Sequence, residues 1–266
     1  MKAAETAAER GHEVLLYEKE QELGGQVNLA MTAPTREEFG ELVRYLVHRI
    51  KQLGVKTVLG VEADAETIEK EKPDAVVIAT GSSPLKNGIT GYWPYEIPGW
   101  EQDNVVCAED VIRNPDIAGK KVVVIDDTNF HRSLAAVEML ANQGKQVEVV
   151  TAALYTFNHL YLTLNLAHAT GRLLEKGVVF SPQSAVKEIS GNTVTVHNIF
   201  LPDKTERKIE GVDTVVMATM KKVNNELYLE MKKRGKVKEI YNIGDSFSPR
   251  KADAAIWEGL KTGRSL

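Results

Sequence analysis

Short apolar runs separated by longer stretches of helical pattern constrain the fold of this chain more than any other feature. Most runs are rich in β-branched residues, and each is too short to be a buried helix. They are residues 14–17, 75–79, 122–125, 147–150, 214–218 and 240–243. This alternation predicts an α/β protein whose strands run parallel in buried sheets.

Helices are predicted between these strands from apolar residues at i, i+3, i+4 spacing. The clearest is residues 35–53, with Gly54 as its stop, and two more are predicted at residues 132–143 and 157–176. Residues 184–209 alternate apolar and polar side chains and include Pro202-Asp203, which indicates an antiparallel hairpin or meander. Residues 84–104 are rich in proline, glycine and aromatic residues and are predicted to be irregular.

The first strand ends in an acidic residue, Glu18, in the sequence Leu15-Leu16-Tyr17-Glu18. In a dinucleotide-binding βαβ unit such an acid binds the adenosine ribose, about 20 residues after a glycine-rich loop that wraps the pyrophosphate. Counting back from Glu18 reaches Met1 inside the helix that should follow that loop. We therefore expect this lobe to lack its own first strand and glycine loop. Upstream residues of a longer gene, a partner chain or a rearranged lobe would each account for this, and we favour the longer gene.

Two such units set the expected domain organisation. One is truncated at its start, and a second begins intact near residue 121. The C-terminal strand and helix cannot begin a unit of their own, so they are expected to return to the first sheet. We predict a discontinuous FAD- or ADP-binding lobe at residues 1–118 and 221–266, with an NAD(P)-binding-like lobe at 119–220 between its two parts.

Small residues follow several predicted strands, where a backbone can approach a cofactor closely. They are Leu23-Gly24-Gly25-Gln26, Ala79-Thr80-Gly81-Ser82 and Ile243-Gly244-Asp245. Asp245 can accept a hydrogen bond from a sugar-like hydroxyl, or it can simply cap the next helix. The second segment can equally be an ordinary loop. Together with Glu18, the three segments favour a binding site.

These segments resemble the C-terminal region of multidomain flavin oxidoreductases of the 2,4-dienoyl-CoA reductase and trimethylamine dehydrogenase type. The resemblance runs from Ala7-Ala8-Glu9-Arg10-Gly11-His12-Glu13-Val14 to Ile243-Gly244-Asp245 and the closing helix. It implies two Rossmann-like lobes of the glutathione-reductase type. It also implies a partner, either a domain or a subunit, that is an Old Yellow Enzyme barrel with FMN and an iron–sulfur cluster.

The resemblance also assigns residues to a cofactor, which in this family is FAD, or ADP alone in the trimethylamine dehydrogenase branch. Glu18 and Lys19 would face the adenosine ribose, and Gly24, Gly25 and Gln26 would line the cofactor. Thr80 and Gly81 would lie beside the pyrophosphate. Gly244 and Asp245 would contact the linker that is ribityl in FAD.

The second lobe departs from a working NAD(P)H site. After its first strand the sequence reads Asp126-Asp127-Thr128-Asn129-Phe130-His131-Arg132 where a glycine-rich turn is expected. Side chains there would block a pyrophosphate, and two carboxylates would repel it. Thr151 supplies neither an acid nor an arginine for the ribose, and Met220 replaces a glycine. We expect no direct NAD(P)H binding by this lobe.

Composition excludes several other classes. A net charge of −4 argues against nucleic acid as a partner. Cys107 is the only cysteine, which rules out an internal disulfide and an iron–sulfur site built from this chain alone. No apolar run is long enough to span a bilayer, and no signal peptide is recognisable, so the expected location is the cytoplasm.

The favoured function is a flavin- or adenine-nucleotide-binding module that relays electrons or supports structure within a larger oxidoreductase. No residue is assigned to catalysis or to a metal. Two alternatives stay open: an inert structural or docking module that binds no nucleotide, and a free-standing NAD(P)H:acceptor reductase. The sequence identifies neither a substrate nor an electron acceptor.

Overall fold

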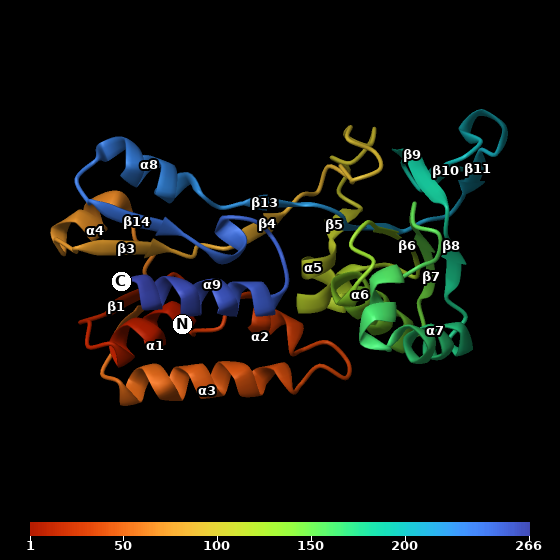
Figure 1. Ribbon diagram of the computed structural model, residues 1–266. Helices are drawn as coiled ribbons and strands as arrows, with labels where there is room; N and C mark the ends of the chain where they lie inside the picture. Colours follow the sequence, from red (N-terminus) through yellow and green to blue (C-terminus); the bar gives the residue numbers. More distant parts are fainter. The chain divides into compact units, whose positions relative to one another are not determined.

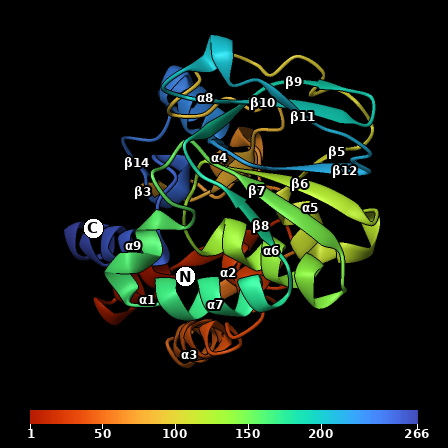
Figure 2. The ribbon, with the colours of Figure 1, turned by 90° about the vertical axis from the view of Figure 1, so that its right-hand side faces the viewer.

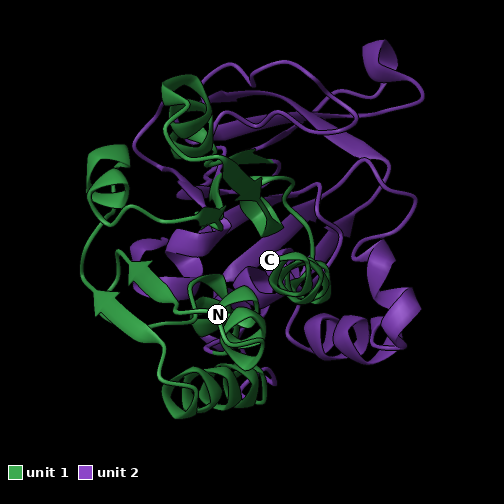
Figure 3. Ribbon diagram, turned by 60° about the vertical axis from the view of Figure 1, so that its left-hand side comes forward, with its two compact units in different colours: residues 1–31, 38–83, 221–266 green, residues 32–37, 84–220 purple.

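The computed structural model describes residues 1–266, which divide into two compact units (Figure 3). Unit 1 comprises residues 1–31, 38–83 and 221–266, and unit 2 comprises residues 32–37 and 84–220. Residues 84–118, which we assigned to the first lobe from the sequence, fall within unit 2.

Unit 1 is built mainly from short parallel strands and the helices around them (Figure 1). Its elements are α1 (Lys2–Glu9), β1 (Leu15–Glu18), α2 (Gln26–Ala30), α3 (Phe39–Gln52), β2 (Lys56–Leu59), α4 (Ala65–Lys70), β3 (Ala75–Ile78), β4 (Ser82–Pro84, of which Pro84 falls in unit 2), β13 (Lys221–Val223), α8 (Glu226–Arg234), β14 (Glu239–Asn242), the 3-10 turn η4 (Gly244–Ser246) and α9 (Ala252–Ser265).

The strands of unit 1 do not form one continuous sheet. β1 pairs with β2 and β14 pairs with β3, each pair parallel, while β4 and β13 form a third two-stranded sheet. An apolar cluster that includes Val76, Ile78, Met231 and Ile240 packs β3 and β14 against α4 and α8. The C-terminal strand therefore returns to strands from the first third of the chain.

Two glycines bring α1 and α9 unusually close together. A Cβ on Gly259 would lie 3.0 Å from the backbone nitrogen of Ala3, and one on Gly263 would lie 2.7 Å from Cβ of Thr6. A Cβ would clash at Gly263 and would be tight at Gly259, so the helices pack nearly backbone to backbone. This contact fixes the C-terminal helix of unit 1 against its N-terminal helix (Figure 1).

Unit 2 holds a five-stranded parallel sheet in the order β5-β12-β6-β7-β8. Its elements are β5 (Val105–Cys107), α5 (Ala108–Arg113), η1 (Pro115–Ile117), β6 (Lys121–Asp126), α6 (His131–Asn142), β7 (Gln146–Val150), η2 (Asn158–Thr163), α7 (Leu166–Glu175), β8 (Val179–Ser181), β9 (Ser184–Ser190), β10 (Thr193–Asn198), η3 (Pro202–Lys204), β11 (Arg207–Ile209) and β12 (Thr214–Ala218).

The sheet of unit 2 lies between helices and a second sheet (Figure 2). Helices α5 and α6 cover one face. The antiparallel sheet β11-β10-β9 packs on the other face through a buried cluster that includes Val123, Ile125, Val194 and Met217. The strands and the antiparallel meander predicted from the sequence are thus present.

One predicted helix is interrupted. Residues 157–176 form the short 3-10 turn η2 and then α7, because Phe157 and Leu164 both adopt the left-handed conformation. Phe157 is fully buried. The left-handed backbone of Leu164, between η2 and α7, is the conformation that a continuous helix excludes.

Candidate functional site

The candidate site lies where β3 and β14 of unit 1 end. These strands are paired in parallel up to Ile78 and Asn242, and the N–H of Ile243 donates to the carbonyl of Ile78 at 3.0 Å. The loops that follow them therefore begin side by side. Ligands of parallel α/β sheets bind beyond the carboxyl ends of the strands, so this is the expected edge for a cofactor.

Gln26 and Asp245 meet at this edge through Ser82. The side-chain amide of Gln26 donates to Ser82 Oγ at 3.2 Å and to Asp245 Oδ2 at 3.3 Å, and the hydroxyl of Ser82 donates to the same oxygen at 2.9 Å. The other carboxylate oxygen, Oδ1, accepts the N–H of Arg250 at 3.0 Å. Asp245 thus orders the loop before α9 and also takes part in a polar cluster.

Four glycines predicted to line a cofactor have positive φ angles. They are Gly24 (130°), Gly25 (54°), Gly81 (77°) and Gly244 (65°). Gly25 precedes α2, where a Cβ would meet no atom within 4 Å, and a Cβ on Gly81 would reach no atom closer than 3.8 Å. The backbone at these two positions is therefore accessible, which suits close approach by a ligand.

Thr80 and Gly81 are held by Asn224, from the segment that returns to unit 1. The hydroxyl of Thr80 donates to the Asn224 carbonyl, and the N–H of Asn224 donates to the Gly81 carbonyl at 3.0 Å. The side chain of Asn224 also accepts a hydrogen bond from Ser83 at 2.9 Å. These contacts fix the loop after β3 before any ligand binds.

Glu18 and Lys19 follow a different two-stranded sheet, at the end of β1. Glu18 is half-buried, and its Oε1 accepts the N–H of Glu20 at 3.1 Å, whereas Lys19 is exposed. The hydrogen bonds that join Gln26, Ser82 and Asp245 do not extend to this pair. The structure thus brings together one group of the predicted residues and places Glu18 and Lys19 in another.

Sequence reasoning did not single out three residues of the site. Ser82 follows Gly81 in one of the predicted segments, but nothing in the sequence marks its hydroxyl as a contact. Lys221, whose ammonium donates to Gln26 Oε1, stands in a short basic run that has no functional pattern. Asn224 carried no sequence signal. Its role depends on pairing between β13 and β4, which are far apart in the chain.

In unit 2 the corresponding strand end carries the two aspartates. Asp126 ends β6 and is 2% exposed, and its Oδ1 accepts the N–H of Asn129 at 2.8 Å. The Asp127 carboxylate accepts the N–H of Gly91 at 3.0 Å. Burial raises the pKa of Asp126 to about 6, against the hydrogen bonds that lower it, and burial also raises the pKa of Asp127.

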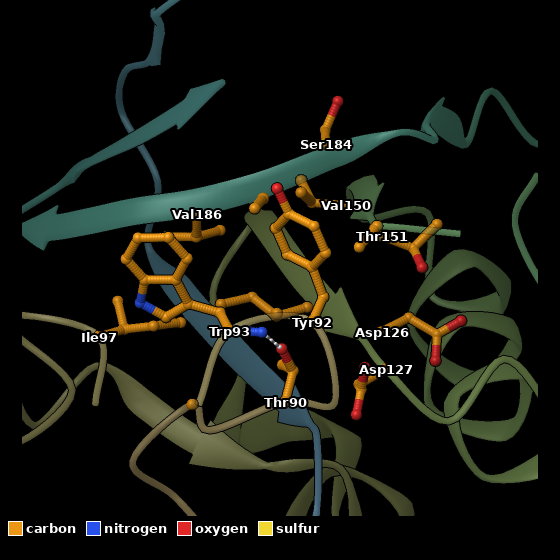
Figure 4. Close-up of a pocket in the computed structure, with 14 residues that line it drawn as sticks. Thr90, Tyr92, Trp93, Ile97, Asp126, Asp127, Val150, Thr151, Ser184 and Val186 are labelled. Carbon is orange, nitrogen blue, oxygen red and sulfur yellow. Dashed lines mark hydrogen bonds between the residues drawn. The ribbon is translucent and has the colours of Figure 1, made fainter. Parts of the chain in front are cut away.

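A small cavity remains above these strand ends (Figure 4). It has a volume of about 20 Å³, and its lining includes Tyr92, Trp93, Val150 and Thr151 beside the two aspartates. That volume is on the order of one water molecule. The aromatic residues come from the irregular segment 84–104, so this segment occupies space above the sheet of unit 2.

The structure carries neither a metal-binding cluster nor a membrane-spanning helix. No set of three or more His, Cys, Asp or Glu side chains is arranged to hold a metal ion. None of the helices combines the length and apolar character that crossing a bilayer requires.

Comparison with known proteins places the chain among nucleotide-dependent oxidoreductases, in agreement with its α/β fold. The sequence profile of the pyridine nucleotide-disulphide oxidoreductase family matches residues 1–259. The N,N-dimethylglycine/sarcosine dehydrogenase of Chromohalobacter salexigens is 28% identical over 98% of the chain and 41% of its own length. The dimethylamine dehydrogenase of Hyphomicrobium sp. is 24% identical over 99% of the chain and 40% of its own length.

A solved structure gives the same result. Histamine dehydrogenase from Rhizobium sp. 4-9 superposes with a TM-score of 0.92 at 25% identity, over 100% of the chain and 42% of its own. The chain thus spans about two fifths of the length of these relatives. The resemblance to C-terminal regions of flavin oxidoreductases, predicted from the sequence, is confirmed.

Proposed function

The chain belongs to the pyridine nucleotide-disulphide oxidoreductase family, and we propose that it is the FAD- or ADP-binding module of a larger flavin-dependent oxidoreductase. The observation that carries this proposal is the cluster of Gln26, Ser82 and Asp245 at the carboxyl ends of β3 and β14. Its donors and acceptors converge at the edge where α/β sheets bind nucleotides. The accessible backbone of Gly25 and Gly81 lies in the same loops.

The residues present fit such a cofactor in chemical type. The carboxylate of Asp245 accepts hydroxyl donors of a ribityl chain or a ribose, and Glu18 does the same for the adenosine ribose. Gly25 and Gly81 leave room beside their backbone for the cofactor. A bound flavin would supply the redox chemistry. This chain would hold and orient the cofactor, and we assign none of its residues to substrate reduction.

We also propose that further polypeptide, from the same or another chain, completes the sheet of unit 1. The strands of unit 1 form separate pairs, β1 with β2 and β14 with β3, where a doubly wound sheet would be continuous. A further parallel strand supplied by another segment or chain would join them and add ladder hydrogen bonds. The greater length of the relatives supports a further domain, which we propose to be the barrel with FMN and an iron–sulfur cluster. The whole protein would be an enzyme, with this module as an electron relay or structural support.

Titration of the purified chain with FAD and with ADP tests the proposal. We expect either ligand to raise the melting temperature, and FAD to remain bound with its visible absorbance after gel filtration. Gln26→Ala should weaken binding because it removes two hydrogen bonds from the cluster. If neither ligand changes the melting temperature, unit 1 is an inert structural module and the proposal fails.

A further inference from the structure

The turn between β6 and α6 in unit 2 encloses the carboxyl group of one of its own residues, Asp126. In dinucleotide-binding folds, the backbone N–H groups of this turn and the first turn of the helix bind the pyrophosphate. Here the carboxylate of Asp126 accepts the N–H of Asn129 at 2.8 Å and the hydroxyl of Thr128 at 3.1 Å. The N–H of Asn129 and the hydroxyl of Thr128, which could each donate to a phosphate oxygen, are therefore already engaged.

The carboxylate is deeply enclosed. Asp126 is 2% exposed, and its second oxygen, Oδ2, has no hydrogen-bond partner. The hydroxyl of Thr128 also lies 3.1 Å from Oγ of Ser133, in the first turn of the 12-residue helix α6. No side chain caps this helix at Phe130. Its N-terminal end thus faces a buried negative group from its own chain.

The surrounding contacts leave no room for a dinucleotide. The N–H of Gly91 donates to Asp127 Oδ2, which ties the irregular segment 84–104 to the turn. Tyr92 and Trp93 lie beside the strand ends, and the remaining cavity has a volume of about 20 Å³ (Figure 4). Pockets for ligands of drug size are about 300 Å³ or more.

The arginine next to the turn is also engaged. The guanidinium of Arg132 forms two hydrogen bonds with Glu109, at 2.7 and 2.8 Å, and a third with the carbonyl of Thr219 at 2.5 Å. Its side chain is 15% exposed. Arg132 is therefore not available to a ligand phosphate.

We propose that the Asp126 carboxylate is a built-in ligand that takes the phosphate position of unit 2, so that this lobe binds no pyridine nucleotide. The turn then serves as a fixed structural element. Removal of the side chain would leave a site of carboxyl size, formed by the N–H of Asn129, the hydroxyls of Thr128 and Ser133 and the end of α6. A small carboxylate such as formate fits this site. The inference does not depend on nucleotide binding by unit 1.

Chemical rescue of Asp126→Gly tests the proposal. We expect the variant to melt well below the wild type in sodium chloride, and about 0.2 M sodium formate at equal ionic strength to raise its melting temperature by about 5 °C. The wild type and Asp127→Gly should show no such formate-specific rise, because neither loses the buried carboxylate. Equal responses of all three proteins to formate would overturn the proposal.

Two further measurements complete the test. If Asp126→Gly folds in formate but not in chloride, the proposal is supported. Asp126→Ala provides the same comparison, with less space left by the removed side chain. NADH and NADPH are added to Glu18→Ala, in which the proposed contact of unit 1 with the adenosine ribose is removed. No change in melting temperature is expected, whereas saturable stabilisation by either nucleotide overturns the proposal even if neither Asp126 variant folds.

Discussion

The side-chain amide of Gln26 donates a hydrogen bond to Asp245 Oδ2 at 3.3 Å, although 219 residues separate the two in the chain. This contact joins the start of α2 to the loop after β14. The candidate site is thus built from both ends of the chain, and most of the sequence of unit 2 separates them along the chain. A ligand bound at Asp245 would stabilise the return of the C-terminal segment to unit 1.

Asp245→Ala should weaken FAD binding more than ADP binding. A hydrogen bond to a charged group contributes about 1.5–3 kcal/mol, so we expect the dissociation constant for FAD to rise by about 10- to 100-fold. ADP has no ribityl chain and should lose little affinity. Isothermal titration calorimetry measures both. The exposed Asp253→Ala, with the same change in charge, is the matched control, and equal losses for FAD and ADP would contradict the assignment of Asp245 to the ribityl linker.

From the sequence, we could predict those site residues whose role depends on their immediate neighbours in the chain. Glycines after strands were recognisable at Gly25, Gly81 and Gly244 because close backbone approach requires that residue type. The roles of Ser82 and Asn224 depend on which loops meet in space, so no pattern in the chain marks them. The break in the helix predicted at residues 157–176 lies at Leu164, whose backbone is left-handed although its side chain is exposed, and no local sequence pattern marks it.

Gly263→Ala should destabilise the protein although it raises helix propensity. The added Cβ would lie 2.7 Å from Cβ of Thr6 and 2.9 Å from the carbonyl oxygen of Ala3, so α1 and α9 must separate. We expect a loss of about 1–2 kcal/mol after the gain in propensity, seen as a melting temperature about 2–6 °C lower. Gly171→Ala in α7 is the control. Its Cβ meets no atom within 4 Å, so the same exchange should be stabilising there.

Arg132→Met should cost far more stability than the same change at Arg113. Arg132 forms a largely buried ion pair with Glu109, whose side chain is 7% exposed, and its removal takes two charged hydrogen bonds from this buried carboxylate. We expect a loss of about 3–5 kcal/mol in urea unfolding. Arg113 pairs with Asp110 at 3.7 Å on the surface, where about 0.5 kcal/mol or less is expected. Similar losses for the two variants would show that enclosure of the Arg132 pair has no energetic consequence.

Asp126→Asn should become more favourable relative to the wild type as the pH rises. Burial raises the pKa of this carboxyl from 3.8 to about 6 in the folded protein. Because the folded state binds the proton more tightly than the unfolded state, the wild type loses stability as the pH rises from about 4 to about 6, and the effect is constant above that range. A shift of about 2 pH units corresponds to roughly 3 kcal/mol. Urea unfolding of both proteins between about pH 4 and pH 8 measures the difference, in which the remaining carboxyls cancel. A difference that stays constant across this range would mean that Asp126 titrates as an ordinary exposed aspartate.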